Sequence, residues 1–304
     1  MKLEKIAYAG WPNCYRLWND QVEAIVTTDV GPRIYRFGFL DGENLLAEFP
    51  EQAGQTGGTT WRSYGGHRLW HAPEDLKRSY APDNSPVSFR SNQEEVHLIQ
   101  DVEAQTGIQK EIDVWMPATG AHLRLTHRLR NHNLWSVELA PWALSVMAPG
   151  GTAILPLPPR RTHDEDLLPS SSISLWSYTD MSDPRWTWGR LYILLRQDPT
   201  AETDQKIGTQ VKDGWAAYAN QGNLFLKRFD YYPDLLYPDL DSSVEVYTNQ
   251  HMLELETLGP LVVLEPGAEA EHVEDWYLFR DIPLPANDRD VQENILPKIQ
   301  ALLA

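Results

Sequence analysis

One stretch of the chain, residues 61–74, concentrates side chains that bind ligands and move protons. It reads Trp-Arg-Ser-Tyr-Gly-Gly-His-Arg-Leu-Trp-His-Ala-Pro-Glu. A histidine exchanges a proton near neutral pH, an arginine binds acceptor oxygens, and a tryptophan stacks on rings. The glycine pair lets the backbone approach a ligand closely. We therefore expect His67, Arg68, Trp70 and His71 in a ligand-binding loop; the alternative is a packed loop whose charges face water.

The spacing of the two histidines also resembles that of metal ligands. On a helix, residues four apart share one face, as zinc ligands do. The glycines before His67 and the proline after His71 disfavour a helix, and the glutamate of the His-Glu-x-x-His motif is absent. The single cysteine, Cys14, excludes a cysteine-based zinc site and a disulfide framework. We expect no metal and no other cofactor.

Two carboxylates alternate in a second segment, residues 252–258, which reads Met-Leu-Glu-Leu-Glu-Thr-Leu. In a strand, Glu254 and Glu256 share one face, roughly 6.6 Å apart. One could act as a general base while the other accepts a hydroxyl, and the like charges would raise at least one pKa. The other interpretation is a strand whose polar face lies in water.

A third segment, residues 175–189, mixes aromatic residues with charges. Trp176, Asp183 and Arg185 could form a cleft wall with an aspartate–arginine pair, or that pair could simply hold an ordered loop. Lys227 lies in an apolar strand pattern and is expected to reach the same cleft or to extend to its edge.

Strands must position these groups, because helical patterns are scarce. Short runs of alternating or apolar residues between turn residues predict strands at 22–28, 33–39, 95–101, 108–116, 121–130, 191–197, 223–229, 243–248, 252–258 and 271–279. In 121–130, alternation puts His127 among leucines, as a core histidine. Residues 288–303 show helical spacing, which Pro297 should kink or divide. We predict one all-β domain over residues 1–304, a large antiparallel sandwich with a short C-terminal helix.

Composition narrows the partners. The chain has 304 residues and a net charge of −17, which argues against nucleic acid and anionic membranes. Trp 12 and Tyr 13 exceed Phe 7, as in sugar-binding clefts, although large sandwich cores also use tryptophan. Phosphate-loop, dinucleotide and hydrolase-elbow motifs are absent. No apolar run has transmembrane length and the first residues lack a signal-peptide core, so we expect a cytoplasmic protein.

The order of several short motifs resembles the galactose mutarotase-like (aldose 1-epimerase-like) superfamily, and more closely an uncharacterised bacterial branch of it. The motifs are Val-Gly-Pro-Arg-Ile at 30–34, Tyr-Gly-Gly-His-Arg-Leu-Trp at 64–70, Leu-Ala-Pro-Trp-Ala-Leu at 139–144, Glu-Val-Tyr-Thr-Asn at 245–249, Leu-Glu-Thr at 255–257, and Leu-Glu-Pro-Gly at 264–267 followed by Trp276. The resemblance implies an antiparallel β-supersandwich whose concave face binds a pyranose.

The resemblance also implies a reaction that needs no cofactor: interconversion of sugar anomers with a glutamate base and a histidine acid. Glu256 matches the family's base in Leu-Glu-Thr, and Glu265 is the alternative. The family's acid lies in a Thr-Asn-His stretch, where this chain has Ala-Pro-Trp142. We therefore expect His67 as the acid, with His71 as second choice. The expected substrate contacts are Arg68, Trp70, His71, Trp142, Trp176, Asp183, Arg185, Lys227 and Glu254.

The sequence thus predicts a carbohydrate-binding protein, an aldose 1-epimerase-like enzyme acting on a monosaccharide or oligosaccharide. Trp142 at the acid's position favours the alternative of a sugar-binding protein without catalysis. A glycoside hydrolase or lyase would pair Glu256 with Asp183 or Glu254. A sugar-phosphate specificity would need a basic pocket, which Arg62, Arg68 and Arg185 could supply. No pattern indicates the oligomeric state.

Overall fold

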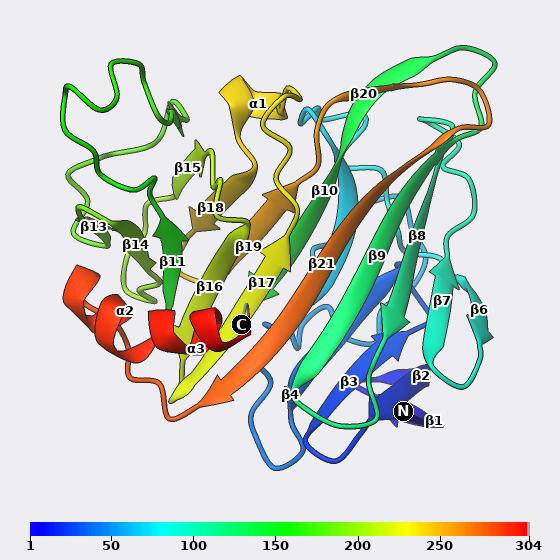
Figure 1. Ribbon diagram of the computed structural model, residues 1–304. Helices are drawn as coiled ribbons and strands as arrows, with labels where there is room; N and C mark the ends of the chain where they lie inside the picture. The colour runs from blue at the N-terminus through cyan, green and yellow to red at the C-terminus, as the bar shows by residue number, and fades with distance from the viewer. Residues whose placement is uncertain (303–304) are drawn as a thin grey trace.

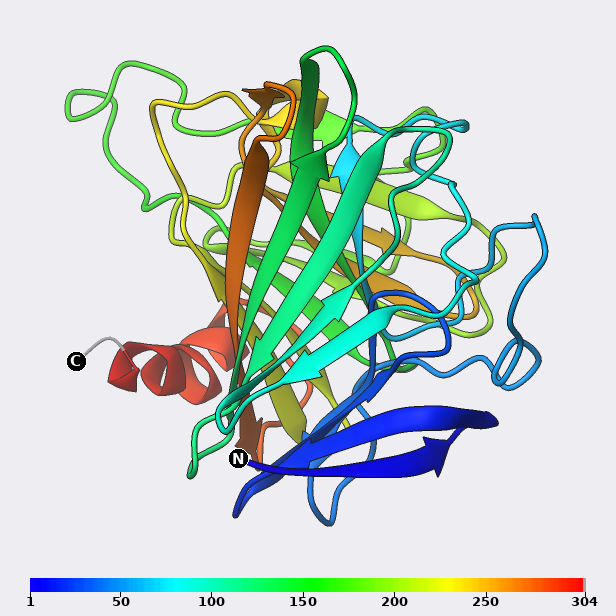
Figure 2. The ribbon, with the colours of Figure 1, turned by 90° about the vertical axis from the view of Figure 1, so that its right-hand side faces the viewer.

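The computed structural model describes residues 1–302, which form two antiparallel β-sheets packed face to face (Figures 1 and 2). The first sheet runs in the order β1 (Lys2–Tyr8), β2 (Trp11–Trp18), β3 (Val22–Thr27), β4 (Arg33–Phe39), β5 (His67–Ala72), β10 (Val137–Met147), β19 (Leu253–Leu258), β18 (Val244–Thr248), β15 (Gln205–Thr209) and β12 (Ile173–Leu175), and β20 (Val262–Leu264) adds to β10. The second runs in the order β13 (Trp186–Trp188), β14 (Tyr192–Arg196), β11 (Thr152–Pro156), β16 (Trp215–Asn220), β17 (Asn223–Phe229), β21 (Glu269–Arg280), β9 (His122–Asn131), β8 (Ile108–Trp115), β7 (Glu95–Ile99) and β6 (Ser88–Ser91). The predicted all-β fold class and large antiparallel sandwich are confirmed.

Every strand predicted from the sequence is present, with ends that differ by a few residues at most. These strands are β3, β4, β7, β8, β9, β14, β17, β18, β19 and β21. Turn residues end them as expected: Gln221 and Gly222, which join β16 to β17, have φ angles of 51° and 75°. Positive φ at both central residues is what a tight hairpin requires.

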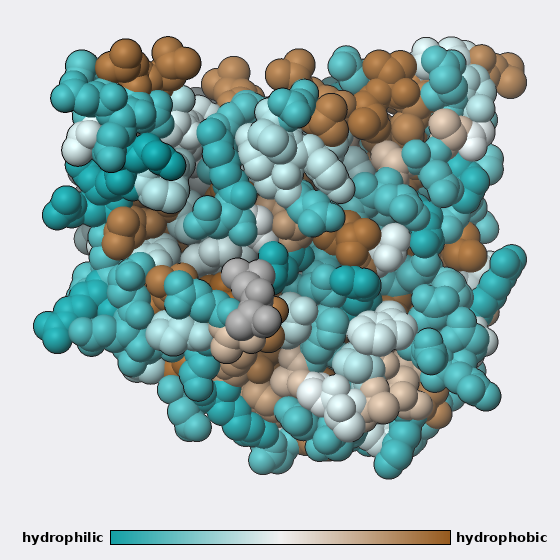
Figure 3. Space-filling model, viewed as in Figure 1, coloured by the Kyte–Doolittle hydropathy of each residue, from teal (hydrophilic) through white to brown (hydrophobic). Residues whose placement is uncertain are grey.

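The main hydrophobic core lies between the two sheets. In β9, Leu123, Leu125, His127 and Leu129 are fully buried, whereas the residues between them are more exposed. The predicted inward face of this strand is therefore confirmed. The outward side chains of β8, β9 and β21 form salt bridges across the strands, and Figure 3 shows this face as mainly hydrophilic.

The segment expected as a ligand-binding loop is partly a central strand. Residues His67–Ala72 form β5, which pairs with β10 along its length and with β4 at its start, and every residue in it is buried. Leu69 belongs to the core between the sheets, whereas Trp70 belongs to a cluster on the other face. A strand covered on both faces lacks the alternation of polar and apolar residues by which strands are recognised.

The C-terminal helical segment is divided as predicted. Helix α2 (Asp288–Asn294) is capped by Ile295, and α3 (Leu296–Ala301) follows with Pro297 in its first turn. Val291, Ile295 and Ile299 pack on the outer face of the second sheet, in front of β16 and β17 in Figure 1. Residue Leu303, the last of the predicted helix, lies outside the described residues.

Residues 1–302 contain one further helix. Helix α1 (Pro238–Asp241) is a single irregular turn, because Asp239 and Leu240 have positive φ. None of the helices in this part of the chain combines the length and the apolar character needed to cross a bilayer.

Candidate functional site

A pocket of about 410 Å³ opens on the face of the first sheet that points away from the second sheet. This volume falls in the range of sites for small organic ligands. Strand alternation selects the side chains that enter it. They are Arg68 and Trp70 from β5, Trp142 and Leu144 from β10, Lys206 from β15, Tyr247 from β18, Glu254 from β19, and Trp61, Glu74, Tyr80, Trp176, Tyr178, Asp204 and Met252 from the connections between strands.

Aromatic rings form much of the pocket wall. The Trp70 ring meets those of Trp142 and Tyr80 edge-on, at centroid distances of 5.3 and 4.9 Å. The Trp61 ring lies 5.6 Å from that of Trp70. Edge-on contacts fix the orientation of each ring, because the positive edge of one meets the negative face of another. The wall is therefore a preformed surface on which the apolar face of a ligand can pack.

An arginine–glutamate pair spans the strands beside these rings. Arg68 Nη2 donates to Glu254 Oε1 at 2.8 Å, and both side chains are about nine-tenths buried or more. The Arg68 guanidinium also lies 4.6 Å from the Trp70 ring and 5.5 Å from the Trp61 ring. Cation–π contacts and the carboxylate together compensate its burial. The pair offers a donor and an acceptor side by side.

A buried lysine between two glutamates also lines the pocket. Lys206 Nζ is 2.7 Å from Glu245 Oε2 and 3.2 Å from Glu256 Oε2. Glu245 and Glu256 face each other directly across β18 and β19, and both are fully buried. Trp142 Nε1 donates to Glu256 Oε2 at 2.8 Å, whereas no hydrogen bond of the described residues reaches Glu256 Oε1.

These charges shift one another's pKa values. Burial raises the pKa of Glu256 to about 7, and the Glu254 charge adds to this, while Lys206 opposes it. Burial also raises the pKa of Glu245 well above its usual range. Burial disfavours the Lys206 ammonium, but the two carboxylates outweigh this and raise its pKa well above the usual value. Lys206 is therefore positively charged, and Glu256 can both take and release a proton near neutral pH.

The structure divides the predicted site residues into three groups. Five line the pocket: Arg68, Trp70, Trp142, Trp176 and Glu254. Glu256 lies against the pocket-lining Trp142 and Lys206 without lining the pocket itself. The other five, which are His67, His71, Asp183, Arg185 and Lys227, are not among the lining residues.

His67 points into the core between the sheets, away from the pocket. His127 Nδ1 lies 2.9 Å from the carbonyl oxygen of His272, which can only accept, so this nitrogen carries the proton. His127 Nε2 then accepts from His67 Nε2 at 2.7 Å, and His67 Nδ1 accepts from the Ser145 hydroxyl at 2.8 Å. Both nitrogens of His67 are thus engaged in the core, which gives no support to His67 as the acid.

The second-choice acid, His71, also points into the protein. It is buried, and its Nε2 lies 3.9 Å from Glu103 Oε2. Lys110 Nζ holds the same carboxylate at 2.6 Å. In β5 the side chains of the even-numbered residues Arg68 and Trp70 face the pocket, whereas those of the odd-numbered residues point into the protein.

We expect the buried histidines to make the fold sensitive to acid. Burial lowers the pKa of His67 and His127, and that of His272 to about 3. Below about pH 6.5 these histidines take up protons in the unfolded chain, whereas in the folded chain they stay neutral. The free energy of unfolding should therefore fall as the pH drops from 7 to 5, measured by urea unfolding. Replacing the exposed His163 with asparagine should leave this slope unchanged, and a constant free energy over that range would contradict the expectation.

Three groups in this core are close enough to suggest a metal. One ligand atom each of His67, His127 and Glu274 lie within 4.8 Å of one another. The two histidines already bond to each other, and the Glu274 carboxylate accepts from Lys227 at 2.9 Å and from Trp276 Nε1 at 2.7 Å. An ammonium group already supplies the positive charge, so this donor set does not suit a cation.

Lys227 therefore belongs to the core, which corrects the expectation that it reaches the cleft. It is fully buried in β17, and it bonds to Glu274 and to the Ala143 carbonyl oxygen, 3.3 Å away in the first sheet. Its apolar flanking residues are typical of a buried strand, and they gave no indication of which sheet face the lysine occupies.

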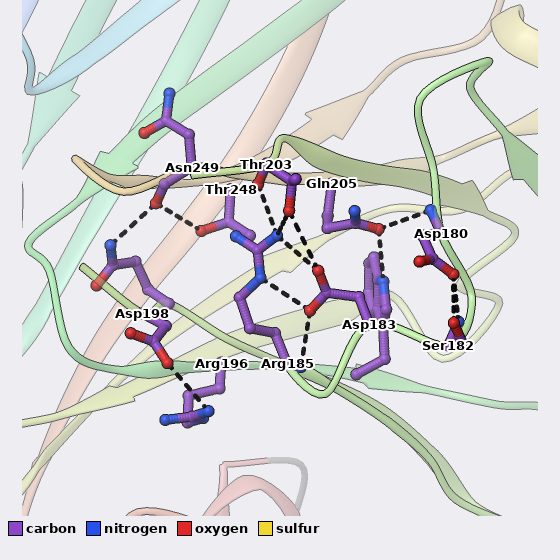
Figure 4. Close-up of polar contacts among 12 residues, drawn as sticks. Asp180, Ser182, Asp183, Arg185, Arg196, Asp198, Thr203, Gln205, Thr248 and Asn249 are labelled. Carbon is purple, nitrogen blue, oxygen red and sulfur yellow. Dashed lines mark hydrogen bonds and ion pairs between the residues drawn. The ribbon is translucent and has the colours of Figure 1, made fainter. Parts of the chain in front are cut away.

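Asp183 and Arg185 hold a loop, the second of the two roles predicted for them. Figure 4 shows Asp183 accepting from Arg185 Nε and Nη2, each at 2.9 Å, while the same Nη2 donates to the Thr203 carbonyl oxygen at 2.6 Å. Gln205 Oε1 accepts from the Asp180 backbone N–H at 2.9 Å. The pair thus anchors the 180–185 loop to the start of β15, the strand that carries Lys206.

Sequence reasoning missed several residues of the site, above all Lys206, which lines the pocket, and its buried partner Glu245. Lys206 lies in an ordinary alternating stretch, Gln-Lys-Ile-Gly-Thr, and its partners are distant in the chain. Glu245 belongs to the Glu-Val-Tyr-Thr-Asn motif at 245–249, but nothing in the sequence around it indicated that its side chain is buried. The segments 61–74 and 175–189 contain three further lining residues, Trp61, Glu74 and Tyr178. Only their residue types indicated that they could bind a ligand.

Comparisons with known proteins bear on the fold. No protein-family model matches the chain, and no curated protein matches it in sequence. Solved structures do match. A galactose mutarotase-like protein from Lactobacillus casei aligns with 87% of this chain and 99% of its own at 9% identity, with a TM-score of 0.55. One from Clostridium acetobutylicum aligns with 92% and 99% at 10% identity, with a TM-score of 0.53.

The Slr1438 protein from Synechocystis aligns with 91% of this chain and 99% of its own, at 11% identity and a TM-score of 0.56. These structural alignments cover most of each chain and show a shared fold. Identities this low leave the activity open. The chain has the galactose mutarotase-like fold, which confirms the architecture that the sequence motifs implied.

Proposed function

We propose that this protein binds a carbohydrate in the pocket over β5, β10, β15, β18 and β19. The observation that carries the proposal is the aromatic wall beside paired polar groups. The C–H face of a pyranose packs on tryptophan rings, while its hydroxyls need both donors and acceptors. Arg68 and Lys206 supply donors and Glu254 supplies an acceptor within one pocket. The mutarotase-like names of the similar structures agree with this proposal.

The charges in the pocket favour an uncharged sugar over a sugar phosphate. Both lining cations, Arg68 and Lys206, are already paired with carboxylates. Glu74 and Asp204 also line the pocket, and they would repel a phosphate. Arg62 and Arg185, the other residues considered for a phosphate, are not among the lining residues.

A second candidate, interconversion of sugar anomers, is favoured by the pKa of about 7 at Glu256. In this reaction the anomeric hydroxyl loses a proton, the bond from the anomeric carbon to the ring oxygen breaks, and the ring oxygen gains a proton. Reclosure from the other face reverses these transfers. Glu256 would take the hydroxyl proton and deliver it to the ring oxygen, each time by exchange through Lys206: the ammonium gives one of its protons to Glu256 as it takes up the one from the sugar, and the delivery runs in reverse. No cofactor is needed. The hydrolase alternative has less support, because Asp183 is bound to Arg185 elsewhere and Glu254 to Arg68.

Proton NMR of a sugar panel tests both candidates. The panel holds glucose, galactose, their 6-phosphates and uronic acids. Saturation transfer from protein to sugar would support binding, and faster exchange between anomer signals would support the epimerase. An absence of transfer across the panel would reject carbohydrate binding of these sugars in the pocket.

We expect Trp70→Ala to weaken binding of a neutral sugar by about 1–3 kcal/mol, the scale of a lost aromatic anchor. Isothermal titration of folded protein measures it. Trp135→Ala serves as the control, because Trp135 is exposed and is not among the pocket-lining residues. An unchanged dissociation constant in Trp70→Ala would place the sugar elsewhere.

A further inference from the structure

Lys206 is held more firmly than a lysine at the edge of a pocket usually is. Its ammonium lies between the carboxylates of Glu245 and Glu256, at 2.7 and 3.2 Å. The rings of Trp142 and Trp176 lie 4.8 Å from the same nitrogen. A free lysine side chain loses considerable rotamer entropy when it is fixed. Here the fold itself restricts the ammonium, so a ligand would not have to.

Only part of the ammonium's hydrogen-bonding capacity is used. The group has three N–H donors. Among the described residues, the two glutamates are its only polar partners, and Lys206 is also one of the pocket-lining residues. At least one donor is thus left for whatever occupies the pocket.

The carboxylate that sequence reasoning selected is less well placed. Glu256 is fully buried and is not among the lining residues, and its Oε2 already accepts from Trp142 and Lys206. We propose that Lys206, and not Glu256, is the side chain that contacts the bound sugar, donating an N–H to an acceptor oxygen of the pyranose. Glu245 is then a positioning residue that holds the ammonium for this contact. The inference rests on the proposed function, since it concerns the same pocket.

Other buried lysines show what a purely structural pair looks like. Lys227 has the single carboxylate of Glu274, and Lys110 has that of Glu103. Neither lysine lines the pocket. Lys206 differs by its second carboxylate and by its access to the pocket. These lysines therefore provide matched controls.

The first test measures the wild-type protein and uses a variant only to assign one signal. In protein with ¹⁵N-labelled lysine, ammonium groups held in buried ion pairs give separate signals, and Lys206→Arg identifies the Lys206 signal. On addition of galactose or glucose, the Lys206 signal should shift while that of Lys227 stays in place. A shift is expected only if the sugar touches or nearly touches the ammonium.

The second test compares two double variants. Lys206→Met/Glu245→Gln and Lys110→Met/Glu103→Gln each remove one buried lysine together with one of its carboxylate partners. In the first variant Glu256 keeps its hydrogen bond from Trp142, and because burial raises its pKa to about 7 it can take up a proton in place of the lost lysine. The first should weaken galactose or glucose binding at least about tenfold, the scale of one charged hydrogen bond. The second should leave the dissociation constant unchanged. Glu245→Gln alone, which keeps Lys206 but loosens it, should weaken binding by a smaller factor.

The outcomes separate the inference from the proposed function. If the wild-type protein binds the sugar, but the Lys206 signal does not move and the Lys206 double variant binds equally well, the lysine is structural and the inference fails alone. If the wild-type protein binds no sugar of the panel, the proposed function fails and the inference fails with it. If the first double variant does not fold, the ¹⁵N measurement on the wild-type protein decides.

Discussion

Lys227→Met is expected to lower the free energy of unfolding by about 3–5 kcal/mol, because it leaves a buried carboxylate without its partner. Lys227 and Glu274 are both fully buried and lie 2.9 Å apart between the sheets. The Lys227 ammonium, with the nearby histidines, outweighs burial and lowers the pKa of Glu274 to about 2. Without the lysine, Glu274 must either stay charged in a low-dielectric core or take up a proton. Urea unfolding at pH 7 measures the loss.

The double variant Lys227→Met/Glu274→Gln is the control. It removes both charges while keeping similar volumes, so it should recover much of the lost stability. A single variant as stable as the wild type would mean that the pair contributes nothing to the core. Sugar affinity per folded molecule should be the same in all three proteins, since neither residue lines the pocket.

The fold could be predicted because its evidence is local. In β9, alternation alone separated the leucines and His127 from the arginines, and burial follows that pattern residue by residue. Pro297 alone indicated the division between α2 and α3. Such features depend on neighbours along the chain, and one sequence contains them.

The site was harder to predict, because the side chains that meet in it depend on which face of its strand each residue occupies. His67 and Arg68 are adjacent in β5, yet one points into the core and the other into the pocket. A shift by one residue reverses every side chain of a strand. Had residues 67–72 been recognised as a strand, alternation would have grouped Arg68 with Trp70 and excluded His67. The Lys206–Glu245–Glu256 cluster joins three strands whose pairing no local pattern indicates.

Glu256→Gln is expected to abolish any acceleration of anomer exchange, by about 100-fold or more, the contribution typical of a general base. Glutamine keeps the shape of the side chain and can still accept a hydrogen bond from Trp142, but it cannot hold a proton. Burial raises the Glu256 pKa to about 7, and a base must be ionised to act. The wild-type rate should therefore rise with pH through about 7 and level off above it, as measured by exchange NMR of the anomer signals.

The matched control is Glu265→Gln, the other glutamate considered for the base. Glu265 is exposed and is not among the residues that line the pocket, so this variant should keep the wild-type rate and pH profile. A Glu256→Gln protein with wild-type exchange would remove Glu256 from the chemistry. If Glu256→Gln binds the sugar as tightly as the wild type and the wild type itself accelerates nothing, the pocket is a binding site without catalysis. In that case the raised pKa of Glu256 reflects only the burial of two carboxylates around Lys206, which hold the lysine in place for the ligand.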